Sequence, residues 1–127
     1  MRFWRTNNLV DLSLIEKDEI RLVVGQRASE TVVSVTGRVT MESSLHLRSL
    51  LLRLLKKCRS TAIDIDIAGV TWLDTSGIAT LLEALKLSQS QSVKLHLVGV
   101  DGQPRILAEI TELATVFAAA GSEVVFS

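Results

Sequence analysis

Two hydroxyl groups, on Thr75 and Ser76, stand between Asp74 and Gly77 where the pattern of the chain changes. The segment 63–85 begins with alternating apolar and polar residues, typical of a strand, and continues with the apolar spacing of an amphipathic helix. A hydroxyl at a helix start has two physical uses. It can accept a hydrogen bond from a free backbone N–H as a cap, or it can carry a phosphate, whose charge the helix dipole tolerates. The first use makes an ordinary turn, and the second makes a switch.

Known catalytic patterns do not fit these residues. A nucleophile elbow requires glycine two residues on either side of its serine, and Asp74 and Ile78 occupy those places around Ser76. His46 and His96 have no spacing that forms a triad or a metal cluster, so we interpret them as surface or half-buried side chains. The phosphate-binding patterns G-x-x-x-x-G-K-[ST] and G-x-G-x-x-G are absent. The sequence therefore predicts a protein that is not an enzyme and that uses no cofactor.

Two further features have simple interpretations. Asp64 and Asp66 share one face of the predicted strand and could bind a cation, although a solvated face is the commoner use, and we predict no metal site. Cys58 fits a small apolar residue at the end of a helix. A single cysteine excludes an internal disulfide and agrees with a reducing compartment.

The composition limits the class of protein. A chain of 127 residues with 47% hydrophobic and 22% charged residues suits one globular domain. The 14 basic residues balance the 14 acidic ones, so no overall charge attracts nucleic acid or a membrane surface. The mean hydropathy is +0.34, yet the longest apolar runs fall far short of the roughly 20 residues that a membrane-spanning helix needs. No apolar segment follows Arg2 and Arg5, so we expect no secretory signal and a cytoplasmic location.

The elements that must position the hydroxyls follow from periodicity. Strands are predicted at 20–24 and 31–35 (as a hairpin), 62–67, 94–98 and 123–126. Strict alternation over 62–67 indicates a strand that is covered on one face. The apolar stripes of three helices are Leu47, Leu51, Leu54, Leu55 and Cys58; then Ile78, Leu81, Leu82 and Leu85; then Leu107, Ile110, Leu113 and Phe117, with Gly121 ending the last helix. Candidate caps are Thr40, Ser43, Ser44 and Asp101, and Pro104 suits a first helical turn.

Residues 1–18 have no sustained period. We interpret them as an N-terminal arm that docks apolar side chains, Trp4 among them, on the domain or on a partner. Residues 19–127 are then a single domain.

The stretch A-I-D-I-D-I-A-G-V-T-W-L-D-T-S-G-I-A-T-L-L-E-A-L at 62–85 resembles the central signature of STAS domains. That family includes bacterial anti-sigma factor antagonists and the tails of sulfate transporters. Its hallmark is an apolar strand with an aspartate, here Asp66, then Asp-[Ser/Thr]-[Ser/Thr]-Gly opening a helix, here 74–77. The resemblance extends over roughly residues 31–117. It implies a STAS-like α/β fold, with a mixed β-sheet of four to five strands packed with three to four α-helices.

The resemblance also implies a function. In anti-sigma factor antagonists the unphosphorylated domain binds an anti-sigma factor that is also a serine kinase, phosphorylation of the hydroxyl before the glycine releases it, and a serine phosphatase resets the domain. On this chain the acceptor is Ser76, with Thr75 as the second choice, and Asp74 would cap the helix or hold the turn. Gly77 would leave room for a partner. The implied partner-binding residues are Arg38, Thr40, Trp72, Asp74, Thr75, Ser76, Gly77 and Ile78.

The chain departs from the family pattern at one turn. Arg38 and Thr40 replace the two acids of the usual Gly-Glu-[Ile/Leu]-Asp, which makes the local charge more positive. Trp72 fits either a core residue or a partner anchor.

Two other functions remain open. The chain could be an accessory subunit that binds the ATPase of a lipid-transporting ABC system, where the helix-start hydroxyl serves the interface without a kinase. Nucleotide binding, attributed to some STAS domains, is a weaker alternative, because no loop here is suited to hold a phosphate.

Overall fold

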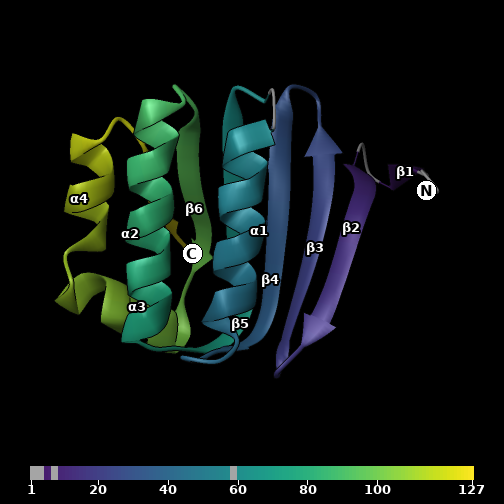
Figure 1. The fold of residues 1–127 in the computed structure, drawn as a ribbon. Coiled ribbons are helices and arrows are strands. Elements are labelled where there is room, and N and C mark those ends of the chain that lie inside the picture. Colours follow the sequence, from purple (N-terminus) through teal and green to yellow (C-terminus); the bar gives the residue numbers. More distant parts are fainter. Residues whose placement is uncertain (1–4, 7–8, 58–59) are drawn as a thin grey trace.

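The computed structural model describes residues 5–6, 9–57 and 60–127. They form one seven-stranded sheet in which the strands lie in chain order, β1 to β7. Four helices complete the described part of the chain, and their buried side chains join those of the sheet in one hydrophobic core. Figure 1 shows α1 and α2 side by side across the sheet. The prediction of a mixed α/β fold is confirmed, although the sheet is wider than the four to five strands expected.

The N-terminal half of the sheet is antiparallel. It contains β1 (Arg5–Thr6), β2 (Leu9–Lys17), β3 (Ile20–Arg27) and β4 (Glu30–Val39). The predicted hairpin is β3–β4, with Ala28 in the left-handed region at its turn.

The interpretation of residues 1–18 as an irregular arm is wrong for 9–17, because β2 pairs with β3 from Val10↔Gln26 to Lys17↔Ile20. The apolar–polar alternation covers only residues 10–14, because Leu9 with Val10 and Leu14 with Ile15 are adjacent apolar pairs, and the pairing register also shifts between Asp11 and Ser13. Trp4 lies outside the described residues, and docking of the apolar side chains of the arm on the domain or on a partner stays a prediction.

The C-terminal half of the sheet is parallel. β5 (Ala62–Leu73), β6 (Lys94–Val100) and β7 (Glu123–Phe126) follow β4 in the same direction. The connections between them are α1 (Ser44–Lys57), α2 (Thr75–Ser90), and the pair α3 (Gly102–Ile110) and α4 (Leu113–Ala119). Since parallel strands end at one edge of a sheet, the starts of α1, α2 and α3 lie together at that edge (Figure 1).

The core lies between the helices and one face of the sheet. Ile63, Ile65 and Ile67 of β5 are buried there, while Asp64 and Asp66 are half-buried on the other face, as their alternation predicts. The helices supply the apolar residues Leu47, Leu50, Leu51, Leu55, Ile78, Leu81, Leu85, Ala108, Leu113 and Phe117.

Two predicted core residues are surface residues instead. Leu82 is 37% exposed, and Ile110 is 73% exposed. The apolar spacing predicts one long helix around Ile110, but Glu112 has a φ of 53° and separates α3 from α4, which changes the face that Ile110 presents. The predicted burial of Cys58 falls outside the described residues. None of the described helices combines the length and the apolar character that crossing a membrane requires.

Candidate functional site

The carboxylate of Asp74 caps α2. Asp74 has an extended backbone, and its Oδ1 accepts hydrogen bonds from the N–H groups of Ser76, at 2.9 Å, and Gly77, at 3.2 Å. The expected role of Asp74 is confirmed, and the alternative in which the Ser76 hydroxyl serves as the cap is wrong. Two of the free N–H groups of the first turn are therefore satisfied without any hydroxyl.

Ser76 and Thr75 are the second and first residues of α2. Thr75 is exposed and Ser76 is half-buried. The Ser76 hydroxyl makes no hydrogen bond with any residue that the structure describes. It lies at the positive end of the helix dipole, where a negative charge is stabilised.

The turn before α2 is held by two other segments. The N–H of Asp74 donates to the Val39 carbonyl at the end of β4, at 3.1 Å. The side-chain amide of Gln103, in the first turn of α3, bonds Leu73 twice: Oε1 accepts from the Leu73 N–H and Nε2 donates to its carbonyl, both at 2.7 Å. Gln103 is not among the residues predicted from the sequence, because nothing in one sequence links residues that are thirty positions apart.

Gly77 faces the interior. It is buried, and a Cβ built on it would lie 2.3 Å from Cδ1 of Leu73 and 3.0 Å from Cγ1 of Val39. The expectation that Gly77 leaves room for a partner is therefore wrong, since the space that it leaves is filled by the core. Ile78 is only 6% exposed, so its side chain also packs inward.

Arg38 and Trp72 form the outer surface beside this turn. They are paired across β4 and β5, and the Arg38 guanidinium lies 5.7 Å from the centre of the Trp72 ring. Trp72 is 41% exposed, so it is not a core residue. An aromatic ring that is held by a cation and partly exposed has the character of a binding hot spot.

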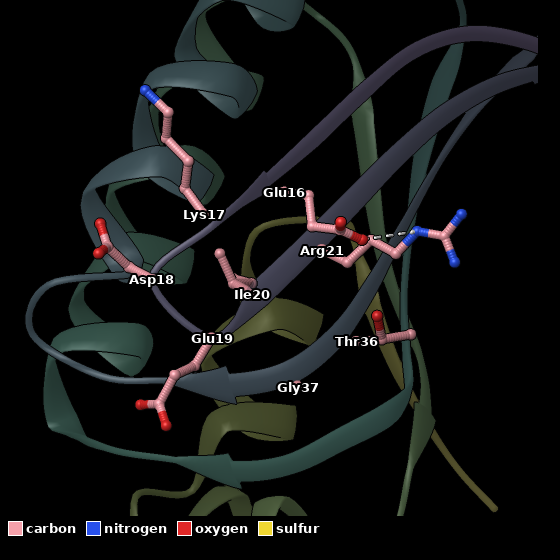
Figure 2. Close-up of a pocket in the computed structure, with 8 residues that line it drawn as sticks. All are labelled: Glu16, Lys17, Asp18, Glu19, Ile20, Arg21, Thr36 and Gly37. Carbon is pink, nitrogen blue, oxygen red and sulfur yellow. Dashed lines mark ion pairs between the residues drawn. The ribbon is translucent and has the colours of Figure 1, made fainter.

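The β2–β3 hairpin brings carboxylates to the same region. Figure 2 shows a hollow at this hairpin, next to Gly37, with the Asp18 and Glu19 carboxylates directed outward. Oε2 of Glu19 lies 3.9 Å from Nε of Arg38, and Asp18 lies 2.7 Å from Nε2 of His46 on α1. The hairpin therefore offsets part of the positive charge that Arg38 brings.

Thr40 lies at the beginning of the turn that precedes α1. Its Oγ1 accepts from the Ser43 N–H at 3.4 Å, and the Ser43 hydroxyl accepts from the Thr40 N–H at 2.8 Å, which is the reciprocal pattern of a capping box. These bonds hold the turn before α1, but neither hydroxyl accepts from an N–H of Ser44–Lys57, so the predicted capping of α1 by this pair is not borne out. The Ser44 hydroxyl instead donates to the Met41 carbonyl at 3.2 Å and caps no N–H.

The structure thus gathers all eight predicted partner-binding residues at one edge of the sheet but exposes them unequally. Arg38, Trp72 and Thr75 are exposed, Thr40, Asp74 and Ser76 are half-buried, and Gly77 and Ile78 are buried.

Asp64, Asp66 and His96 lie on the face of the sheet away from the helices. Asp64 Oδ1 lies 2.9 Å from Nδ1 of His96, and Asp66 accepts from the Ala68 N–H at 2.9 Å. A hydrogen bond with Asp64, together with its like charge, raises the pKa of Glu30 above its ordinary value. Within the described ranges, no three His, Cys, Asp or Glu side chains come together as metal ligands.

Solved structures with the same fold include an anti-sigma factor antagonist from Mycobacterium paratuberculosis (20% identity, TM-score 0.69, covering 77% of this chain and 82% of that one). The anti-sigma factor antagonist SpoIIAA in its unphosphorylated form is similar at 11% identity and TM-score 0.69, with 84% and 87% covered. A sulfate transporter family protein from Wolinella succinogenes is similar at 13% identity and TM-score 0.63, with 77% of each chain covered. At these identities the similarity establishes the fold.

No curated protein matches the chain. The family model described as the STAS domain matches residues 19–125. That match spans most of the chain, including the helix start at Asp74–Gly77. The chain therefore belongs to the STAS domain family.

Proposed function

We propose that this protein is an anti-sigma factor antagonist, a non-enzymatic module that binds an anti-sigma factor with serine kinase activity and is released when Ser76 is phosphorylated. The observation that carries the proposal is the state of the Ser76 hydroxyl. It sits in the first turn of α2 with no hydrogen-bond partner among the described residues, while the Asp74 carboxylate does the capping. The resemblance of the fold to anti-sigma factor antagonists supports the same function.

The switch acts through charge. A phosphate adds about −1.5 to −2 charges at neutral pH. At Ser76 it would stand at the helix N-terminus, which tolerates a negative charge, but next to the Asp74 carboxylate, which already occupies the N–H groups of Ser76 and Gly77. The phosphate would therefore extend outward. There it would prevent close docking by desolvation and repulsion, while the fold would remain intact.

The surface around Ser76 suits a protein partner. Trp72 and Arg38 stand on one side, and Met41, in the turn before α1, is 72% exposed. An exposed aromatic ring with a cation and an apolar side chain nearby is the composition found at the centres of protein interfaces. Gly77 and Ile78 support this surface from inside and do not contact the partner.

We further propose a cytoplasmic location and a serine phosphatase as the second partner, because a reversible switch requires removal of the phosphate.

The test is a binding and phosphorylation experiment with the full chain. Affinity capture by the wild-type protein should retain a protein of the kinase-like ATPase fold, and incubation with that protein and ATP should add one phosphate to Ser76, located by mass spectrometry. Retention of an ABC-type ATPase with no phosphate transfer would favour the transporter subunit instead.

Three variants complete the experiment. Ser76→Asp should fold normally and lose at least about a hundredfold in affinity, equivalent to ~3 kcal/mol. Ser76→Ala should bind and resist release by ATP, whereas the neighbouring Thr75→Ala should still be released by ATP, because it keeps the acceptor hydroxyl. Wild-type affinity of Ser76→Asp, or transfer of phosphate to Thr75, would reject Ser76 as the switch.

A further inference from the structure

A groove of about 710 Å³ runs between α1 and α2, away from the proposed switch. On α1 the lining residues extend from the second turn to the C-terminal end, and on α2 they belong to the C-terminal half: Arg48, Leu52, Lys56, Glu83, Lys86, Leu87, Gln89 and Ser90. Leu52 and Leu87 are half-buried and form its apolar part. No other element of the described chain covers these two helices in Figure 1.

The charges in the groove are unbalanced. Arg48 donates from Nε and Nη2 to the two carboxylate oxygens of Glu83, both at 2.7 Å, and these bonds lower the pKa of Glu83. The only carboxylate of the groove is thereby taken. Lys56 and Lys86 make no ion pair with any residue in the described ranges.

Local helix energetics explain only one of these lysines. Lys56 lies in the last turn of α1, where a cation is stabilised by the helix dipole. Lys86 precedes the last turn of α2, which contains no basic residue. Among the described residues, Lys86 therefore has neither an ion-pair partner nor a place at the end of its helix, and it lies beside the half-buried Leu87.

We propose that this groove is a docking site for an acidic amphipathic helix of a partner protein. The ridges of two neighbouring helices accept the apolar side chains of a third, as in other helix-in-groove complexes. From Arg48 to Lys56 the groove extends ~12 Å at 1.5 Å per residue, which matches two turns of a helix. Leucines of the partner would contact Leu52 and Leu87, and its carboxylates would pair with Lys56 and Lys86.

This site is separate from the proposed switch. Glu83, the lining residue of α2 nearest to the helix start, lies seven residues after Ser76, or ~10 Å along the axis. Ion pairs at the protein surface are screened over about 8–10 Å at physiological salt. Docking in the groove should therefore not depend on the charge at Ser76, and the protein could hold one partner while it exchanges another.

The probe for the test is a synthetic 14-residue peptide with leucines at helical i, i+3, i+4 and i+7 spacing and glutamates elsewhere. The matched control peptide replaces every glutamate with lysine. Titration of the ¹⁵N-labelled full chain at low salt should shift the backbone resonances of the groove residues in a saturable way with the acidic peptide. Affinity for the basic peptide should be at least tenfold weaker.

Charge-reversal variants locate the site. Lys56→Glu combined with Lys86→Glu should weaken binding of the acidic peptide at least tenfold. Lys57→Glu combined with Lys94→Glu changes the net charge equally at exposed lysines outside the groove, and should weaken it less than threefold. Ser76→Asp should bind the peptide as wild type does, whatever its effect on the proposed kinase partner. Thermal melting checks that all variants are folded.

Several results would overturn the proposal: no saturable shift, equal binding of the two peptides, shifts centred on the start of α2, or equal losses in the two double variants. If the groove resonances shift with protein concentration alone, and sedimentation velocity shows a dimer, the groove belongs to a second copy of this chain instead.

Discussion

The starts of α2 and α3 look alike in sequence but differ in structure. Asp74 and Asp101 each follow a parallel strand and occupy the N-cap position with an extended backbone. Asp74 accepts two hydrogen bonds from the first turn of its helix, whereas Asp101 makes no side-chain cap bond. The prediction that Asp101 caps its helix is therefore wrong.

The residues that follow the two aspartates differ at the third helical position and in the backbone of the first. A capping carboxylate bonds the N–H of the second or third helical residue. After Asp74 the third residue is Gly77, whose N–H is available. After Asp101 it is Pro104, which has no N–H, and the intervening Gly102 has a φ of +60°.

The start of α3 instead serves the start of α2. Gln103, its second residue, uses its side chain to hold the backbone of Leu73, next to Asp74. One helix start is thus built to be stable and exposed, and the other is built to support it. Substitutions at the start of α2 and at the start of α3 should therefore change the stability of the fold by different amounts.

The largest change in the free energy of unfolding is expected from substitutions of Gly77, compared with the same substitutions of Gly102. Gly77 is limited by space, so Gly77→Leu should destabilise the fold by ~3 kcal/mol or more relative to Gly77→Ala, because the longer side chain must displace Leu73 and Val39. A Cβ added to Gly102 would meet no heavy atom within 4 Å, so this position is limited only by its backbone angle. Gly102→Leu and Gly102→Ala should therefore cost about the same, ~1 kcal/mol each. Urea denaturation of the four variants measures both differences, and a Gly77 pair of equal stability would contradict the packing argument.

Removal of the support from α3 comes next. Gln103→Ala leaves the N–H and the carbonyl of Leu73 without their partners, and should cost ~2 kcal/mol. The Leu73 amide should also exchange its hydrogen faster. Gln89→Ala, at an exposed position of α2, is the matched control and should leave stability within ~0.5 kcal/mol of wild type. If the Leu73 amide exchanges at the wild-type rate in Gln103→Ala, the turn before α2 is stable without the hydrogen bonds of Gln103.

The two aspartates give a direct comparison. Asp74→Ala should lose ~1 kcal/mol, the usual cost of removing an N-cap. Asp101→Ala should change stability by less than ~0.5 kcal/mol, because no cap bond is lost. Chemical denaturation of the two variants under identical conditions measures the difference. Equal losses would mean that Asp101 also caps α3 in solution.

Much of the fold was predictable from short-range patterns. The Ile63–Ile67 alternation gave β5 its buried and solvated faces, and β-branched runs gave the β3–β4 hairpin. The missing parts have identifiable causes. The alternation of β2 is short, because it ends at adjacent apolar residues on either side of residues 10–14, and the break at Glu112 depends on a backbone angle that the composition does not reveal.

The site was predictable to the extent that its residues are neighbours in sequence. The cap by Asp74 needs only residues two and three positions away, and it was expected. Three other features depend on contacts between distant segments, which a single sequence does not contain. They are the packing of the Gly77 Cα against Leu73 and Val39, the hydrogen bonds of Gln103 with Leu73, and the position of Glu19 beside Arg38.

The smallest effect isolates the cause of the missing cap. If Pro104 prevents capping, Pro104→Ala supplies an N–H at the third position of α3, and the Asp101 carboxylate can accept it. The stability of Pro104→Ala by itself is uninformative, because this substitution also removes a buried ring and raises the conformational entropy of the unfolded chain. A double-mutant cycle with Asp101→Ala cancels both of these contributions to the free energy of unfolding and leaves the interaction between the two positions. Loss of the carboxylate should cost ~0.5–1 kcal/mol more in the Pro104→Ala background than in wild type. A coupling energy of zero would place the cause in the backbone turn at Gly102, and Gly102→Ala should then show the coupling instead.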